Sequence, residues 1–194
     1  MSSHHVIRDE QEPPIFVLDE NFDIDVLNEL LGWAPLLYVE ASLYKWFQAR
    51  NVKVDGIILL NDIDDTDYEG ITKYYLSTLK DSLLELVMQV INNKPFTAFN
   101  LFCNEAQGRE VVEESRIGPE KYLPFTLFIG GKKTIVTFKN KLAKWFPAGQ
   151  RIIVDQNRVT ISPKVELNGD SYEVKEEGTY TFTAEELPLV IEEF

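Results

Sequence analysis

Hydrophobic and polar positions follow two different periods along the first 103 residues. Short apolar runs, typical of buried strands, alternate with stretches whose apolar residues recur with the period of a helix face. Asp23 or Asp25 is placed to cap the first helix, and Gly32 is placed to end it. The pattern predicts strands at 15–18, 36–39, 54–60 and 96–103, and helices at 24–31, 41–51 and 69–92. This succession favours an open, mostly parallel sheet of the Rossmann type with right-handed crossovers.

The pattern changes after Glu120, where short strands separated by turn residues take over. Residues 125–129 and 134–138 flank Gly130-Gly131, which predicts a hairpin. Further strands are predicted at 151–154, 159–162, 172–174, 179–183 and 189–191. We therefore expect an all-β sandwich in this half. The expected division is an N-terminal tail at 1–14, an α/β domain at 15–140 and a β-sandwich domain at 141–194.

Charge and composition exclude several classes of protein. The 194 residues include 19 Lys and Arg against 32 Asp and Glu, a net charge of −13. A nucleic-acid backbone or an anionic membrane would repel such a chain, so neither is expected as a partner. No apolar run approaches the roughly 20 residues that span a bilayer, and the first residues do not form a signal peptide. We expect a cytoplasmic protein.

Cysteine and histidine usage narrows the chemistry further. The single Cys103 suits a reducing compartment and excludes an internal disulfide. The two histidines, His4 and His5, both lie in the tail, so a mechanism that needs an ordered imidazole lacks its base. Without a histidine to activate it, Cys103 is expected to be a buried structural thiol.

An acidic cluster follows the third predicted strand, at residues 61–69. Ligands of open α/β sheets bind at the carboxyl ends of strands. Asp62, Asp64 and Asp67 are spaced to hold Mg²⁺, which would screen the charge of phosphates. The same segment also fits an acidic helix start with Thr66 or Asp67 as the N-cap. The pattern leaves a metal site and a helix start both open.

Several segments carry a family resemblance. Residues 4–13 read His-His-Val-Ile-Arg-Asp-Glu-Gln-Glu-Pro, and residues 62–67 read Asp-Ile-Asp-Asp-Thr-Asp. Residues 141–149 read Lys-Leu-Ala-Lys-Trp-Phe-Pro-Ala-Gly. These segments resemble the thiamine pyrophosphokinases, which transfer diphosphate from ATP to thiamine. The first resembles the lead-in of one bacterial branch, the second the metal and substrate motif D-Q-D-x-T-D, and the third the start of the C-terminal β domain. Residues 27–35 and 53–55 fit the same framework.

The resemblance implies a fold and a set of site residues. The family has an α/β nucleotide domain followed by a β-sandwich that helps to bind thiamine, and it forms homodimers whose active site is shared between subunits. By this resemblance Asp62, Asp64 and Asp67 would hold Mg²⁺, and Asp64 and Asp67 would be catalytic. Thr66 and Ser171 would contact the bound ATP or thiamine.

The departures from the family fall on ligand-contacting positions. Asp19-Glu20-Asn21 stands where the family has a glycine after the first strand, and Glu40-Ala41 replaces an Asp-Gly pair after the second. The metal-binding motif G-D-x-D-S has no counterpart. Only Gly108-Arg109 remains of the element D-H-x-x-x-N, and Ser171-Tyr172 aligns with a Ser-Asn thiamine contact. Framework positions thus persist while ligand positions change.

Two functions follow from this pattern. The first is a catalytically impaired relative that is retained as a binding, regulatory or structural dimer, with thiamine or a nucleotide as a candidate ligand. The alternative is a divergent, active enzyme that transfers diphosphate with Mg²⁺ held by the aspartates of 62–67. Phosphoryl transfer depends on positioned metal and positive charge around the phosphates. The loss of a metal motif and of the glycine that lets phosphate approach therefore favours the first function.

Overall fold

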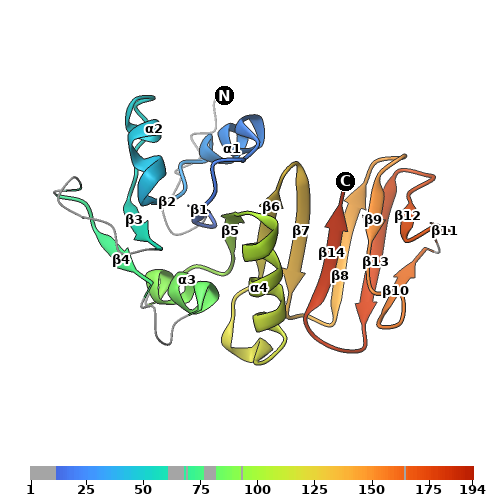
Figure 1. The fold of residues 1–194 in the computed structure, drawn as a ribbon. Coiled ribbons are helices and arrows are strands. Elements are labelled where there is room, and N and C mark those ends of the chain that lie inside the picture. The colour runs from blue at the N-terminus through green and yellow to red at the C-terminus, as the bar shows by residue number, and fades with distance from the viewer. Residues whose placement is uncertain (1–11, 61–67, 69, 77–81, 93, 164) are drawn as a thin grey trace, which may run out of the picture.

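The computed structural model describes residues 12–60, 68, 70–76, 82–92, 94–163 and 165–194. It is a mixed α/β structure with one large and one small sheet (Figure 1). The helical elements are α1 (Ile24–Leu31), η1 (Ala41–Leu43), α2 (Tyr44–Gln48), α3 (Leu83–Ile91), α4 (Glu105–Ser115) and η3 (Pro119–Lys121). The strands are β1 (Ile15–Val17), β2 (Leu37–Glu40), β3 (Gly56–Leu59), β4 (Lys73–Tyr75), β5 (Phe99–Phe102), β6 (Phe125–Ile129), β7 (Lys132–Thr137), β8 (Lys141–Phe146), β9 (Arg151–Ile153), β10 (Val159–Ser162), β11 (Glu166–Asn168), β12 (Ser171–Glu173), β13 (Gly178–Ala184) and β14 (Leu189–Glu193).

The large sheet has the strand order β11-β12-β9-β14-β7-β6-β5-β1-β2-β3-β4 in the described part of the chain. Its strands from β4 to β6 are parallel, and those from β6 to β11 are antiparallel. The chain builds β1, β2, β3 and β4 in one direction and then returns to place β5 on the other side of β1. This reversal between β1 and β5 is a topological switch point, where open α/β sheets form their ligand crevice.

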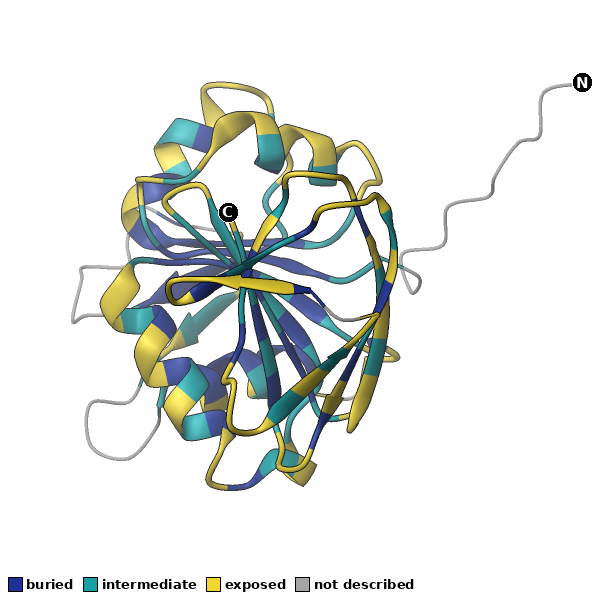
Figure 2. Ribbon diagram, turned by 90° about the vertical axis from the view of Figure 1, so that its right-hand side faces the viewer, coloured by how far each residue is buried: buried dark blue, intermediate teal, exposed yellow. Residues whose placement is uncertain are grey.

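Helices and the small sheet cover the large sheet on both faces. Phe102, Phe47 and Leu27 belong to a core between one face and the helices α1 and α2. A second core, on the opposite face, includes Leu84 and Val111 from α3 and α4. The small antiparallel sheet, β10-β13-β8, closes a third core against the far end of the large sheet. Figure 2 shows the buried residues concentrated in the central strands and the exposed residues on the outer helix faces.

Many sequence predictions agree with the structure. The predicted strands at 15–18, 54–60 and 96–103 contain β1, β3 and β5, and β2 matches the prediction at 36–39 with a shift of one residue. Asp23 caps α1 by accepting hydrogen bonds from the backbone N–H groups of Asp25 and Val26. The hairpin is also confirmed, with Gly130 and Gly131 at φ values of 53° and 82°. A two-residue turn with both residues at positive φ matches the twist of the flanking strands, which explains the two glycines.

The helix predicted at 69–92 is wrong in its first half. Residues 73–75 form β4, parallel to β3, and α3 begins only at Leu83. Ser82 caps α3 by accepting a hydrogen bond from the N–H of Glu85. Gly70 has a φ of +81°, and the β-favouring run Thr72-Lys73-Tyr74-Tyr75 gains backbone partners on the edge of β3. The hypothesis of an acidic helix start with Thr66 or Asp67 as the N-cap falls on residues outside the described ones, and residues 70–76, which would continue that helix, are not helical.

The second half of the chain contributes to both sheets. Strands β9, β11, β12 and β14 extend the large sheet beyond β7, so strands from both sides of residue 140 share it. The structure adds β8 and β11, which the sequence pattern did not predict. Among the described residues, no helix has the length and apolar character needed to cross a membrane.

Candidate functional site

The candidate site is the carboxyl edge of the parallel strands. The loops after β1 and β5 begin at Leu18 and Cys103 and flank the switch point. The loop after β2 begins at Ala41, beside them. In an open α/β sheet this edge is the default location of a ligand. The polar groups of these loops therefore decide what the edge can bind.

Asp19 closes the switch point from the β1 side. One carboxylate oxygen accepts hydrogen bonds from the backbone N–H of Asn21 at 2.9 Å and from its side-chain amide at 3.1 Å. The other oxygen accepts a 3.4 Å hydrogen bond from the side-chain amide of Asn104, which follows β5. The pair bridges the loops on either side of the crevice. A phosphate bound here would need hydrogen-bond donors, but the Asp19 side chain is a carboxylate, which only accepts hydrogen bonds.

Glu40 ends β2 with a buried carboxylate that serves the local backbone. It is 8% exposed and accepts a 2.8 Å hydrogen bond from the N–H of Ser42, together with a hydrogen bond from the Ser42 hydroxyl. The contact caps η1. The Tyr68 hydroxyl donates a buried 3.2 Å hydrogen bond to the carbonyl of Ala41, and its ring packs edge-on against Tyr44. Tyr68 thus covers the end of β2, and the Glu40 carboxylate is hydrogen-bonded to the turn that follows the strand.

The two helices that begin at this edge have capped N-termini. Asp23 accepts hydrogen bonds from the first turn of α1 at 2.9 and 3.2 Å. Asn104 and Gln107 form a reciprocal capping box at the start of α4, with both bonds at 3.0 Å. Free helix N-termini bind anions because their N–H groups lack partners. Here side chains already take up several of those N–H groups.

Cys103, directly after β5, and Gly108, in α4, lie close to each other and to β6 beside the switch point. Cys103 is 5% exposed, which confirms the expected burial. Burial, with a smaller effect from the charge of Asp19, raises the pKa of the Cys103 thiol to about 12, so the thiol is protonated at neutral pH. A Cβ atom on Gly108 would collide with the side chain of Ile129, and it would lie 3.6 Å from the Cys103 sulfur. Gly108, a candidate motif remnant, therefore lets α4 approach β6.

The sequence-predicted site residues fall in two places. Asp62, Asp64, Thr66 and Asp67 lie outside the described residues. Ser171 is buried at the start of β12, where its hydroxyl accepts from Arg151 at 3.4 Å and donates to the carbonyl of Asn168 at 3.3 Å. Six strand steps of about 4.8 Å each separate β12 from β1. One chain therefore does not bring Ser171 to the carboxyl edge near β1.

Sequence reasoning missed two residues of this edge. Tyr68 is 27 residues from Ala41, and only the fold brings the two together. Asn104 carries a readable signal, since Asn-x-x-Gln is a capping-box pattern at a helix start. Within the described ranges, no group of three or more His, Cys, Asp or Glu side chains is placed to hold a metal ion. The arrangement that is described presents satisfied acceptors rather than phosphate-binding donors.

Comparison with known proteins identifies the fold. No protein-family model and no curated protein sequence matches the chain. Among solved structures, the thiamine pyrophosphokinase of Bacillus subtilis aligns over 93% of this chain and 98% of its own, with a TM-score of 0.63 and 10% identity. The thiamin pyrophosphokinase of Candida albicans aligns over 95% and 90%, with a TM-score of 0.60 and 9% identity. The yeast enzyme covers 96% and 86%, with a TM-score of 0.59 and 10% identity. The chain has the fold of the thiamine pyrophosphokinases.

Proposed function

We propose that this chain is a thiamine pyrophosphokinase-like protein that does not transfer diphosphate and acts as a binding, regulatory or structural dimer. One observation carries the proposal. The carboxylates of Asp19, in the loop after β1, and of Glu40, the last residue of β2, are hydrogen-bonded to donors of this chain at the edge where a nucleotide would bind. In this proposal residues 15–140 form a Rossmann-like domain and residues 141–194 a β-sandwich domain.

The chemistry of phosphoryl transfer supports this proposal. The reaction needs metal ions and cationic or N–H groups around the transferred phosphates. Asp19 and Glu40 would repel those phosphates unless a metal lay between them, and their hydrogen bonds to Asn21, Asn104 and Ser42 compete with metal binding. Tyr68 also covers the backbone at Ala41, the position that the resemblance aligns with the glycine of the family's Asp-Gly pair.

The aspartates of 62–67 provide the test against the alternative of an active enzyme with Mg²⁺ held by Asp62, Asp64 and Asp67. If they form a metal site, their mutual repulsion destabilises the free protein and Mg²⁺ relieves it. We expect millimolar Mg²⁺ to change the melting temperature of the wild type by less than about 2 °C, which corresponds to under 1 kcal/mol for a chain of this size. Differential scanning fluorimetry on wild type and Asp64→Asn measures this.

Asp170→Asn is the matched control, because Asp170 lies in an exposed turn between β11 and β12. A stabilisation by Mg²⁺ that persists in Asp170→Asn and disappears in Asp64→Asn would revive the kinase hypothesis. Equal behaviour of the three proteins would support the non-catalytic one.

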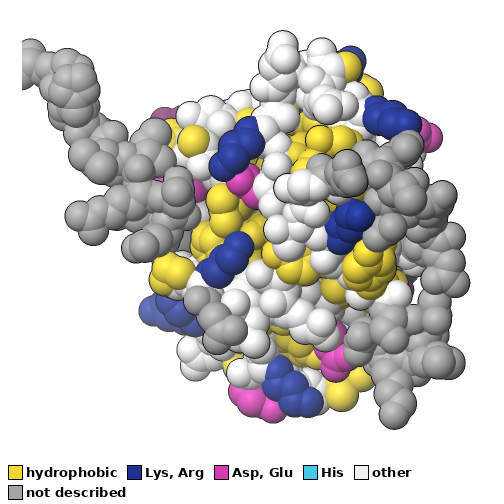
Figure 3. Space-filling view, turned by 90° about the vertical axis from the view of Figure 1, so that its left-hand side faces the viewer, with side chains coloured by type: hydrophobic (Ala, Val, Ile, Leu, Met, Phe, Trp, Pro, Cys, Tyr) yellow, Lys and Arg dark blue, Asp and Glu magenta, His cyan; other side chains and the backbone are white. Residues whose placement is uncertain are grey.

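A homodimer is the second part of the proposal. In the described part of the chain β4 and β11 are the edge strands of the large sheet, and β8 and β10 are those of the small one. Figure 3 shows hydrophobic side chains, with Lys and Arg between them, on the side of the molecule where β4 lies. Strand edges and apolar surface of this kind favour a further partner. A site that combined Ser171 with the loops after β1 and β2 would also need two chains.

Sedimentation velocity tests the dimer. At about 50 µM, a concentration at which a standard-size interface is formed, we expect a single species of twice the chain mass. A monomer at that concentration would remove the dimer from the proposal and leave the non-catalytic assignment to be judged by the other measurements.

A further inference from the structure

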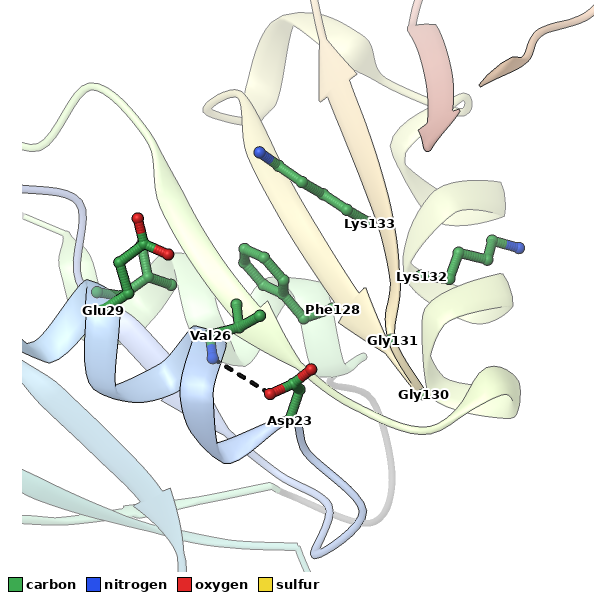
Figure 4. Close-up of a pocket in the computed structure, with 9 residues that line it drawn as sticks. Asp23, Val26, Glu29, Phe128, Gly130, Gly131, Lys132 and Lys133 are labelled. Carbon is green, nitrogen blue, oxygen red and sulfur yellow. Dashed lines mark hydrogen bonds between the residues drawn. The ribbon is translucent and has the colours of Figure 1, made fainter. Parts of the chain in front are cut away.

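A pocket opens between α1 and the β6–β7 hairpin, away from the closed end of β2. Its volume is about 290 Å³, at the lower end of the range for small-molecule sites. Val26 and Leu30 of α1 form one apolar wall, and the Phe128 ring of β6 faces them. Figure 4 shows Glu29 on the helix side of this gap and Lys133 on the hairpin side. The pocket thus has an apolar centre between groups of opposite charge.

Lys133 supplies a cation that no described carboxylate pairs with. Its cross-strand neighbour on β14 is Glu193, but the Glu193 carboxylate forms its ion pair with Lys144 of β8. Lys133 and Lys144 thus both lie near Glu193, whose carboxylate pairs with Lys144. Burial lowers the pKa of Lys144, and the nearby charge of Lys133 lowers it further. The hydrogen bond to Glu193 acts in the opposite direction and raises this pKa. An anion beside Lys133 would relieve this excess of positive charge.

The helix side of the pocket supplies the opposite charge. Asp23 also lines the pocket, but its carboxylate caps the first turn of α1. Glu29, two turns along the helix, is exposed and forms no ion pair with a described residue. Its side chain lies on the helix side of the gap (Figure 4). A ligand ammonium group would find its counter-charge here.

The turn of the hairpin leaves room for a ligand beside Lys133. Gly130 and Gly131 line the pocket, and a Cβ atom on either would meet no heavy atom within 4 Å. The adjacent Lys132 points to the opposite side of β7, where it forms a 2.7 Å ion pair with Glu192 (Figure 4). Both lysines line the pocket, but the Lys132 side chain points away from the gap between α1 and the hairpin, and the Lys133 side chain lies on the hairpin side of that gap (Figure 4).

We propose that this pocket binds a small zwitterion of the amino-acid class with an apolar side chain. The ligand's anionic group lies at Lys133, its ammonium group at Glu29, and its apolar body between Val26, Leu30 and Phe128. The proposal goes beyond the function proposed above and does not rest on it, because Asp19 and Glu40 are not among the described residues that line the pocket.

Calorimetric titration of the full chain with three matched probes tests the site. L-Phenylalanine carries both charges, phenylacetate only the anionic one, and phenethylamine only the cationic one. We expect saturable binding of L-phenylalanine, at least about tenfold tighter than that of either singly charged probe. A hydrogen bond to a charged group contributes about 1.5–3 kcal/mol, which corresponds to tenfold or more.

Variants and chemical shifts complete the test. Lys133→Gln and Glu29→Gln should each weaken L-phenylalanine binding about tenfold, and the control Lys132→Gln should change it less than twofold. On the wild type, amide NMR signals of Gly130 and Gly131 should shift on titration, while that of Ser171 should not. The proposal is overturned by equal affinity for phenylacetate, by equal losses in Lys132→Gln and Lys133→Gln, or by shifts that spare the hairpin turn.

Discussion

Replacing Phe16 by alanine is expected to lower the free energy of unfolding by about 3–5 kcal/mol, the loss typical of a fully buried aromatic side chain. Phe16 is inaccessible in β1, between β2 and β5 of the large sheet. Its ring stacks on Tyr38 at 4.9 Å and meets Phe99 edge-on at 6.1 Å. Removing the ring leaves a cavity at the centre of the sheet. Urea denaturation followed by circular dichroism measures the change.

Trp33→Ala is the control for the loss of an aromatic ring as such. Trp33 follows α1 and is 58% exposed. Its removal should change the free energy of unfolding by no more than about 0.5 kcal/mol, as for other surface positions. A loss below about 1 kcal/mol for Phe16→Ala would mean that β1 is not the centre of the core.

The second large effect is expected at Glu40. Glu40→Ala should lower the free energy of unfolding by about 1.5–3 kcal/mol, because it removes the charged acceptor that binds the N–H and hydroxyl of Ser42 and caps η1. A carboxylate kept for ligand binding behaves in the opposite way, since its removal relieves strain or repulsion and leaves stability unchanged or higher. The sign of the change therefore separates a structural Glu40 from a ligand-binding one.

Glu20→Ala is the matched control, since Glu20 is exposed in the loop after β1 at the same edge. It should change the free energy of unfolding by at most about 0.5 kcal/mol. If Glu40→Ala were as neutral as Glu20→Ala, or more stable than wild type, Glu40 would not be committed to the turn and the proposed function would lose its main support.

Local signals in the sequence were sufficient for much of the fold. The apolar run at 15–17 follows two prolines, Asp23 offers an N-cap, and Gly130-Gly131 specifies a tight turn. Each of these depends on neighbours in sequence. The helix predicted at 69–92 fails in its first half because Ile71, Tyr75 and Leu79 match a helical period by spacing alone. A strand at 73–75 becomes favourable only once β3 offers its edge, and that is tertiary information.

The candidate site was less predictable for the same reason. The sequence drew attention to Glu40-Ala41 as a departure from the family, but not to the Ser42 and Tyr68 contacts that explain its structural use. The hydrogen bond between Asp19 and Asn104 joins residues 85 apart in the chain. Ser171 matched a motif, yet the strand order places it on β12, far from β1. The spacing of residues along the chain does not predict which of them are neighbours in the folded protein.

The conversion of thiamine to thiamine diphosphate by the purified protein tests the central claim most directly. The assay uses saturating Mg-ATP and thiamine, chromatographic detection of the product, and an active thiamine pyrophosphokinase as the positive control. If Asp19, Glu40 and Tyr68 close the carboxyl edge as described, the chain should form no more product than a reaction without protein. Turnover at about one per second, a low but ordinary enzyme rate, would contradict the account and establish the chain as a divergent kinase.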